Sequence, residues 1–366
     1  MKKMGVSMKI RRSRKSILIM ILAVFQTAST AACRENTGAN LDMDLLVKEM
    51  EFSGAILVAK NGEVVFKSAL GFADSNCKVP LTTRSSMNLA SVSKLFTAAA
   101  IMILSENSRL QLDDPAAKYL PELAYAPGIT IRHLLHHTGG LPDIYDILEK
   151  GWDKSKIASN EKLLSIFARQ KPQPLFEPGE KMEYSNTGYI VLASIVEKVS
   201  QLPFYRFMDD HIFIPLEMSD SFVYYRTMEK FPRSARVYGL RRDNGAFALD
   251  DLIYCDGMRG DGNVYSSVED LFKWDRALYG EKLLKPETIR MMFTPGRLNN
   301  GALTDYGFGF GISDKGRVVS HGGAWVGFRS LLVRYLDRED TIIMLINCPS
   351  MKAGGILDKI KRRFGL

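Results

Sequence analysis

Segments with the pattern of β-strands lie at the two ends of this chain, and helical patterns fill the region between them. Near the start, residues 54–60 and 63–66 flank Asn61-Gly62, a dipeptide preferred in type I′ hairpin turns because both positions need a positive φ. Late in the chain, apolar segments at 306–312, 317–321, 327–336 and 341–347 read as strands. We expect the early hairpin and the late strands to join in one antiparallel sheet, which makes the region between them an inserted helical lobe.

Helical spacing of apolar residues recurs in the middle third of the chain, around 132–137, 161–169, 189–199 and 204–212. Further helices are predicted at 41–50, 93–106, 268–278 and 351–364, of which 93–106 is strongly apolar. With 366 residues and 46% hydrophobic content, the chain can bury a large core. We therefore predict one α/β domain of the α+β type over 42–366. Its sheet lobe comprises about 42–112 and 256–366, and its helical lobe about 113–255.

The first 32 residues have the pattern of a secretory signal peptide. Residues 1–15 carry seven Lys and Arg and no acid, and an apolar run at 17–25 and small residues at 27–32 follow. The uncharged stretch is short for a membrane-spanning helix of about 20 apolar residues. Thr30-Ala31-Ala32-Cys33 resembles a bacterial lipobox, with Thr in the position usually held by Leu. The expectation is export to the bacterial cell envelope, a lipid on Cys33 and a tether over 33–41; ordinary cleavage near Ala31 or Ala32 is the alternative.

The net charge of +8 gives no reason to expect a nucleic-acid partner. Without the basic residues of the signal segment, the net charge is about +1. The three remaining cysteines, Cys77, Cys255 and Cys348, show no C-x-x-C spacing. One disulfide and three isolated buried thiols are equally compatible with this pattern.

A Ser-x-x-Lys sequence places a hydroxyl and an amine on one helix face, where the lysine can help to activate the serine. The chain contains three such sequences, beginning at Ser75, Ser91 and Ser159. Only Ser91 with Lys94 opens a long apolar helix, which would desolvate the lysine and set the serine at the positive end of the helix dipole. Ser75 lies in a polar loop, and Ser159 reads as the N-cap of a surface helix. N-capping is also the alternative reading of Ser91.

Two later segments contain groups that acyl transfer could use. Taken singly, each has an alternative reading, in which Tyr184 caps a helix and His321 packs beside a turn. Tyr184 and Asn186 precede an apolar helix, and a phenol near an ammonium can relay a proton from the serine to a leaving group. His321, Gly323 and Ala324 end a short predicted strand. The glycines would let a substrate backbone approach, and the Ala324 N–H would join the Ser91 N–H as an oxyanion hole.

These three motifs, in this order, resemble those of the penicillin-recognising serine hydrolases. The match is to the class C β-lactamase-like branch, which includes D-Ala-D-Ala carboxypeptidases, D-aminopeptidases and esterases. Supporting segments lie at 52–55, 112–115, 131–140, 176–179 and 306–309, so the resemblance spans about 42–350. It implies a β-lactamase/transpeptidase-like fold with the active site between the two lobes.

The resemblance also implies roles. Ser91 would form the acyl-enzyme, Lys94 and Tyr184 would handle its proton, and Asn186 would orient Lys94 and the substrate amide. His321 stands where many relatives carry the lysine of Lys-Thr-Gly, and a partly charged histidine is a weaker anchor for a substrate carboxylate. The predicted function is hydrolysis of an ester or a D-amino-acid amide or peptide, with carboxypeptidase or esterase activity favoured over efficient β-lactam hydrolysis.

Other readings fit less well. His133 and His137 lie four residues apart, but Leu134 stands where a zinc protease needs Glu. We expect no metal or organic cofactor, and a small molecule or peptide as substrate. Gly260-Asp261-Gly262 reads as a plain turn, and Trp325 either lines the substrate pocket or packs in the core.

The alternative function is a non-catalytic envelope lipoprotein that binds penicillin or peptidoglycan. The sequence does not address the oligomeric state.

Overall fold

The computed structural model describes residues 53–232, 236–349 and 355–366. All of these belong to one compact unit. The predicted signal peptide, Cys33, the tether and the helix at 41–50 lie outside the described residues.

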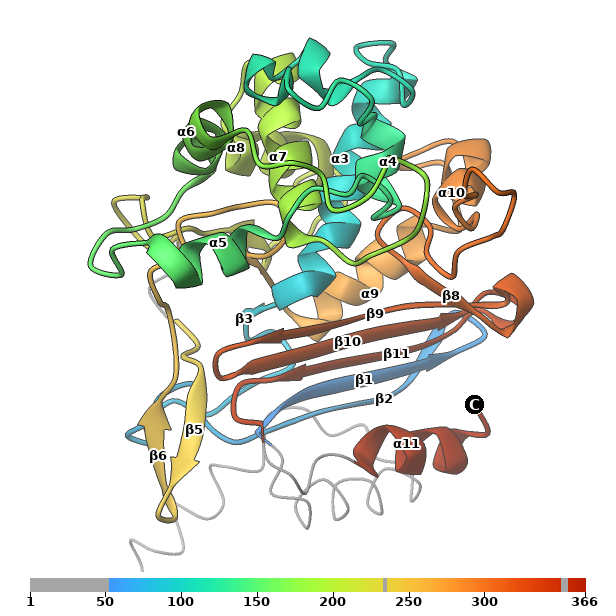
Figure 1. The fold of residues 1–366 in the computed structure, drawn as a ribbon. Helices are drawn as coiled ribbons and strands as arrows, with labels where there is room; N and C mark the ends of the chain where they lie inside the picture. Colours follow the sequence, from blue (N-terminus) through green and yellow to red (C-terminus); the bar gives the residue numbers. More distant parts are fainter. Residues whose placement is uncertain (1–52, 233–235, 350–354) are drawn as a thin grey trace, which may run out of the picture. The chain divides into compact units, whose positions relative to one another are not determined.

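A six-stranded antiparallel sheet joins the two ends of the domain (Figure 1). Its order is β2-β1-β11-β10-β9-β8. The strands are β1 (Gly54–Lys60), β2 (Glu63–Leu70), β8 (Gly311–Ser313), β9 (Val318–Trp325), β10 (Phe328–Tyr335) and β11 (Asp340–Ile346). Asn61 and Gly62 turn the first hairpin with φ of 50° and 79°, as their sequence predicts. The pairing of β1 with β11 confirms that the early hairpin joins the late strands.

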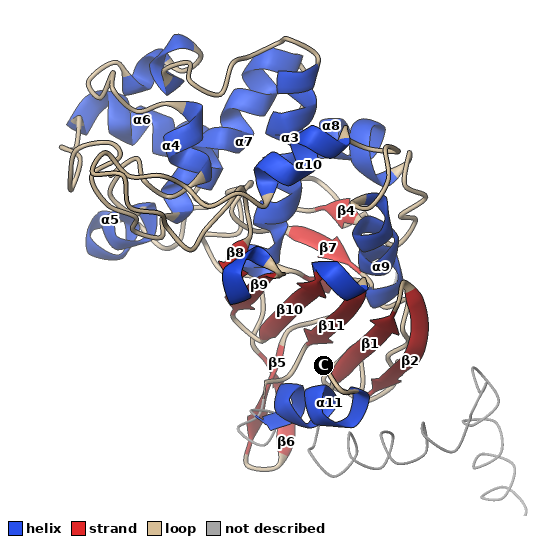
Figure 2. Ribbon diagram, turned by 90° about the vertical axis from the view of Figure 1, so that its right-hand side faces the viewer, coloured by secondary structure: helices blue, strands red, loops and turns tan. Residues whose placement is uncertain are grey.

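Helices lie on both faces of this sheet. The helix α9 (Val268–Ala277) packs on β1 and β11, and α11 (Ile356–Phe364) lies on the opposite face (Figures 1 and 2). The ring of Phe364 in α11 lies 6.1 Å from that of Phe66 in β2. The short helix α10 (Pro286–Met292) stands beside α3 (Ser93–Glu106).

The middle of the chain forms the helical part of the unit, as predicted. Its helices are α4 (Ile131–Leu135), α5 (Ile144–Gly151), α6 (Asn160–Gln170), α7 (Asn186–Ser200) and α8 (Phe204–Met208). Two small sheets accompany them: β3 (Met87–Asn88) with β7 (Val264–Ser266) and β4 (Phe222–Val223), and β5 (Leu240–Asp243) with β6 (Ala246–Leu249). Among the described residues, no helix combines the length and the apolar character needed to cross a membrane. The mixed α/β architecture confirms the predicted fold class.

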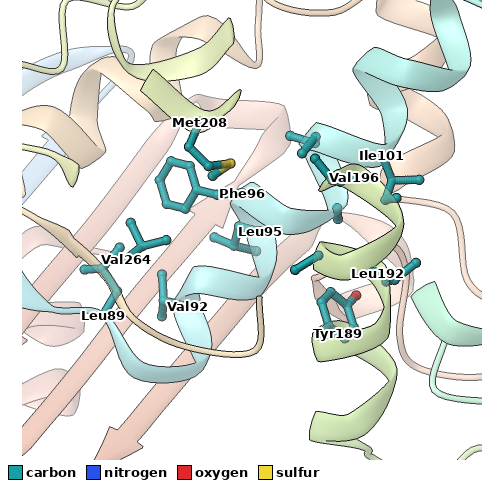
Figure 3. Close-up of a cluster of buried hydrophobic side chains, with 14 of the residues drawn as sticks. Leu89, Val92, Leu95, Phe96, Ile101, Tyr189, Leu192, Val196, Met208 and Val264 are labelled. Carbon is teal, nitrogen blue, oxygen red and sulfur yellow. The ribbon is translucent and has the colours of Figure 1, made fainter. Parts of the chain in front are cut away.

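The helix α3 is the centre of the core. Every residue from Ser93 to Leu104 is buried. Figure 3 shows Phe96 of α3 next to Met208 of α8, and it shows Leu192 and Val196 on α7, the helix that packs beside α3. Burying each such side chain is worth about 1.5–3 kcal/mol. This packing holds the N-terminal end of α3 in a fixed place next to the sheet.

Two expectations fail in detail. The predicted strand at 306–312 is paired in the sheet only from Gly311, and its earlier part is a turn. The N–H of Phe308 donates to the carbonyl of Met292 at the end of α10, and Gly309 has a φ of 81°. This part of the segment is therefore hydrogen-bonded to α10 and does not pair with β9. The cysteines Cys77, Cys255 and Cys348 are all free thiols; Cys77 is exposed, so the reading of three buried thiols is wrong for that residue.

Candidate active site

Ser91 lies in a 3-10 turn, Ala90–Val92, that leads directly into α3. Ala90 has a φ of 46°, an unusual value for a residue with a Cβ. The Ala90 N–H donates to Oδ1 of Asn88 at 2.8 Å, which helps to hold the turn. Ser91 therefore precedes the helix instead of lying in it, and its side chain faces the cavity described below.

Lys94 is fully buried beneath Ser91. Its Nζ lies 3.2 Å from Ser91 Oγ, 2.9 Å from Asn186 Oδ1 and 2.9 Å from the backbone carbonyl of Asp261. The ring centroid of Tyr184 is 5.0 Å from the same nitrogen. An ammonium has three N–H donors, and these three oxygens match them.

Tyr184 is 42% exposed at the mouth of the site. The imidazole of His137 packs against its ring at 4.3 Å between centroids. The N–H of Ser185 donates to Nδ1 of His137 at 3.1 Å, which ties the tyrosine segment to the histidine. Burial, reinforced by Lys94, lowers the pKa of His137 well below its ordinary value. This histidine is thus a neutral support for Tyr184.

A cavity of about 320 Å³ opens beside Ser91. It is lined by Asn88, Ala90, Ser91, Tyr145, Tyr184, Asn186, Cys255, Asp256, Asp261, Gly262, Asn263, Ala324 and Trp325. The cavity thus brings Ser91, Tyr184, Asn186 and Ala324 together, although they come from three distant parts of the sequence.

Two aromatic side chains of the cavity wall are held by buried carboxyl groups. The indole Nε1 of Trp325 donates to Asp256 Oδ1 at 2.7 Å, and the Tyr145 hydroxyl donates to Asp261 Oδ2 at 2.8 Å. The two rings lie 5.4 Å apart. Of the two readings of Trp325, the structure shows the pocket-lining one. Burial raises the pKa of Asp256 to about 6.

Gly323 has a different role from the one its motif suggests. A Cβ at this position would lie 2.4 Å from the carbonyl oxygen of Leu89 and 2.2 Å from Ser330 Oγ. The glycine therefore lets strand β9 approach the turn that carries Ser91. At Gly322, in contrast, the nearest atom to an added Cβ is 3.9 Å away.

His321 lies in β9 and does not line the cavity. It is 8% exposed, and its Nδ1 lies 2.7 Å from the Gly322 carbonyl, so Nδ1 carries the hydrogen. Its Nε2 then accepts the hydroxyl of Tyr306 at 2.9 Å. Burial, with a smaller contribution from Lys94, lowers the pKa of His321 to about 3. The expectation of a partly charged histidine is therefore wrong: this ring is neutral at physiological pH and both of its nitrogens are engaged.

The other sequence candidates lie apart from this cavity. Ser159 caps α6 and accepts the N–H of Lys162, as predicted. His133 Nδ1 accepts the N–H of Thr130 in the N-cap of α4, so this ring and that of His137 serve separate contacts. Within the described ranges, no group of three His, Cys, Asp or Glu side chains is arranged to hold a metal ion.

Sequence reasoning missed four residues of the site: Asp143, Tyr145, Asp256 and Asp261. None belongs to a motif, and Asp261 was read as part of a plain turn. Asp143 accepts the backbone N–H and the side-chain Nδ2 of Asn186, at 3.0 and 3.1 Å. Acidic residues in the loops between predicted helices are the signal that was available.

The fold and the site define a serine hydrolase-like architecture, and comparisons with known proteins agree. The Beta-lactamase family profile matches residues 44–363. The chain is 38% identical over 316 residues to penicillin-binding protein 4* of Bacillus subtilis. The aligned region covers 83% of this chain and 70% of that protein. The chain therefore belongs to the beta-lactamase family.

The chain is also similar to a D-aminopeptidase and to a solved penicillin-binding protein structure. The chain is 27% identical over 300 residues to a D-aminopeptidase of Brucella anthropi, covering 80% of this chain and 56% of that protein. Among solved structures, a penicillin-binding protein from Bacillus halodurans superposes with a TM-score of 0.76 at 24% identity, covering 87% of this chain and 98% of that chain. At that identity the likeness concerns the fold. The predicted family is confirmed.

Proposed function

We propose that this protein is a serine hydrolase that forms an acyl-enzyme on Ser91. The observation that carries the proposal is the 3.2 Å contact between Ser91 Oγ and the fully buried Lys94 Nζ, at the wall of a cavity. A buried lysine that is held within hydrogen-bond distance of a serine is one arrangement that can help to activate this weak nucleophile.

In the proposed reaction, Ser91 Oγ attacks the carbonyl carbon of the substrate while its proton passes to the Tyr184 oxygen. The Lys94 ammonium nitrogen lies 5.0 Å from the centroid of the Tyr184 ring, and its charge stabilises the Tyr184 phenolate before this transfer. The leaving group takes the proton from Tyr184 as its bond to the carbonyl carbon breaks. Water then attacks the acyl carbon of the ester on Ser91 while Tyr184 accepts one of its protons. Tyr184 returns that proton to Ser91 Oγ as the bond between Oγ and the acyl carbon breaks and the acid leaves.

The backbone N–H groups of Ser91 and Ala324 are the proposed donors to the oxyanion. Both residues line the same cavity, and Gly323 brings their two backbone segments together. Such donors act because they are already oriented when negative charge develops on the carbonyl oxygen.

The proposed substrate is an ester or a D-amino-acid amide or peptide. Among the described residues that line the cavity, none is Lys, Arg or His, while two are aspartates. A substrate carboxylate would meet these two acids and no lining cation. The likeness to a D-aminopeptidase supports an amide or peptide substrate. Substrates without a free carboxylate near the scissile bond should therefore react faster than penicillins.

Burst kinetics test the proposal. Mixing the enzyme with p-nitrophenyl acetate, D-alanine p-nitroanilide and nitrocefin should give, for one of the first two, a burst of product equal to the enzyme concentration and then steady turnover. Stoichiometric acylation with no turnover would favour a non-catalytic binding protein instead. No acylation by any of the three would contradict the proposal.

We further propose that the protein is exported and anchored through a lipid on Cys33. The basic segment, apolar run and Thr30-Ala31-Ala32-Cys33 sequence support this. Metabolic labelling of a bacterial host with an alkyne fatty acid should tag the wild-type protein and leave Cys33→Ala untagged. Equal tagging of both proteins, or of neither, would contradict the anchor.

A further inference from the structure

We propose that Asp143 is a positioning residue, which fixes the side-chain amide of Asn186 so that its oxygen faces Lys94. The proposal rests on the acyl-enzyme function proposed above, because it concerns how Lys94 is held beside Ser91. Asp143 is the N-cap of α5 and does not line the cavity, so it acts through Asn186.

Three N–H groups converge on the Asp143 carboxylate. Oδ1 accepts the N–H of Tyr145 at 2.9 Å. Oδ2 accepts two hydrogens from Asn186, one from its backbone N–H at 3.0 Å and one from Nδ2 at 3.1 Å. A carboxylate has acceptors on both oxygens and no donor, so it satisfies all three groups.

The contact with Nδ2 decides the orientation of the Asn186 amide. One end of an amide donates and the other accepts. Because Nδ2 is bound to Asp143, Oδ1 points to Lys94 Nζ at 2.9 Å. The reverse orientation would place the NH₂ group against the lysine ammonium and would bring the amide oxygen against the carboxylate. Both of these contacts are repulsive, so the carboxylate selects one orientation.

An amide at position 143 cannot replace the carboxylate. If the oxygen of the new amide faced Tyr145, its NH₂ group would face the two donors of Asn186. If the oxygen faced Asn186, the NH₂ group would face the N–H of Tyr145. Each orientation sets donor against donor. If Asp143 served only as a helix cap, replacing it with Asn or Ser would have little effect, because these residues cap helices about as well as Asp.

The test compares Asp143→Ser and Asp143→Asn with Asp146→Asn. Asp146 is exposed in the first turn of the same helix, so its substitution removes a charge from α5 without touching Asn186. The serine variant keeps a capping oxygen for Tyr145 and loses the contact with Asn186. Thermal unfolding of each variant establishes that it folds. The acylation rate is measured by stopped flow with p-nitrophenyl acetate and by active-site labelling with a fluorophosphonate.

Both Asp143 variants should acylate about 10- to 100-fold more slowly than wild type, which is the loss seen in metal sites when a residue that orients a metal ligand is replaced. The substrate dissociation constant, obtained from the concentration dependence of the stopped-flow acylation rate, should change little, because Asp143 does not line the cavity. Asp146→Asn should acylate at the wild-type rate. Acylation by folded Asp143→Ser within twofold of wild type would overturn the proposal, as would an equal loss in Asp146→Asn. Failure of the wild-type protein itself to acylate would instead refute the proposed function.

Discussion

The hydroxyl of Tyr306 lies 2.9 Å from Nε2 of His321, and the Gly322 carbonyl lies 2.7 Å from Nδ1 of the same ring. The Gly322 carbonyl can only accept, so the hydrogen of the neutral imidazole lies on Nδ1, and Nε2 accepts the Tyr306 hydroxyl. His321 therefore supplies no positive charge to the site at physiological pH.

His321 should stay neutral through the physiological range. Its Cε1–H NMR signal should not shift between pH 8 and pH 5, whereas in the urea-unfolded chain histidines titrate near pH 6.5. Because the folded-state pKa is about 3, only the unfolded chain gains this proton as the pH falls below 6.5. His321 should thus remove roughly 1.4 kcal/mol of stability per pH unit between about pH 6 and pH 4, and His321→Gln should abolish that part of the slope. A midpoint near pH 6.5 in the folded protein would contradict the assignment.

Asp256 should have the opposite effect on stability. Its folded-state pKa of about 6 exceeds that of an exposed Asp, so the folded chain holds a proton that the unfolded chain has lost between about pH 4 and pH 6. The wild-type protein should lose stability as this carboxyl ionises with rising pH. Asp256→Asn should therefore gain roughly 2 to 3 kcal/mol relative to wild type between pH 4 and pH 8, measured by urea unfolding. A constant difference between the two proteins would refute the raised pKa.

Tyr184→Phe should lower the acylation rate about 10²- to 10⁴-fold, because it removes the proposed proton carrier and leaves the ring in place. The matched control is Tyr189→Phe, since that ring also lies near Lys94 Nζ, at 5.7 Å, but its hydroxyl donates to the Leu135 carbonyl. The control should lose about 1 kcal/mol of stability and keep most of its rate. Near-normal acylation by Tyr184→Phe in stopped-flow assays would remove Tyr184 from the mechanism.

Gly323→Ala should separate strand β9 from the turn that carries Ser91. Its new methyl group would lie 2.4 Å from the Leu89 carbonyl oxygen, too close for any real contact. Loss of one oxyanion donor costs about 2.7–4 kcal/mol, so acylation should fall about 10²- to 10³-fold. Gly322→Ala has open space and should retain its activity. Equal rates for the two alanine variants would show that the close approach is unimportant for the reaction.

Much of the fold was predictable because its signals are local. Asn61-Gly62 predicts its own hairpin, and the apolar run at 93–106 predicts α3 with the bounds that the structure shows. The segment at 306–310 was misread as a strand because its aromatic and glycine alternation suits one. The contact that bends it, from the N–H of Phe308 to the carbonyl of Met292, joins it to another element.

The residues of the proposed active site were predictable for the same reason, but the side chains and carbonyls that hold them in place were not. Ser91 and Lys94 lie on adjacent turns, so their contact follows from spacing. Asp261 reaches Lys94 through a backbone carbonyl, which no side-chain pattern reveals. The neutrality of His321 depends on burial beside Tyr306, which motif spacing does not encode.

The identity of the nucleophile is tested most directly by mass-spectrometric peptide mapping after treatment with a fluorophosphonate. The wild-type protein should carry one adduct, on Ser91, and Ser91→Ala should carry none. Ser75→Ala and Ser159→Ala, which remove the serines of the other two Ser-x-x-Lys sequences, should be labelled as fully as the wild type. Undiminished labelling of folded Ser91→Ala would contradict the assignment of Ser91 as the nucleophile.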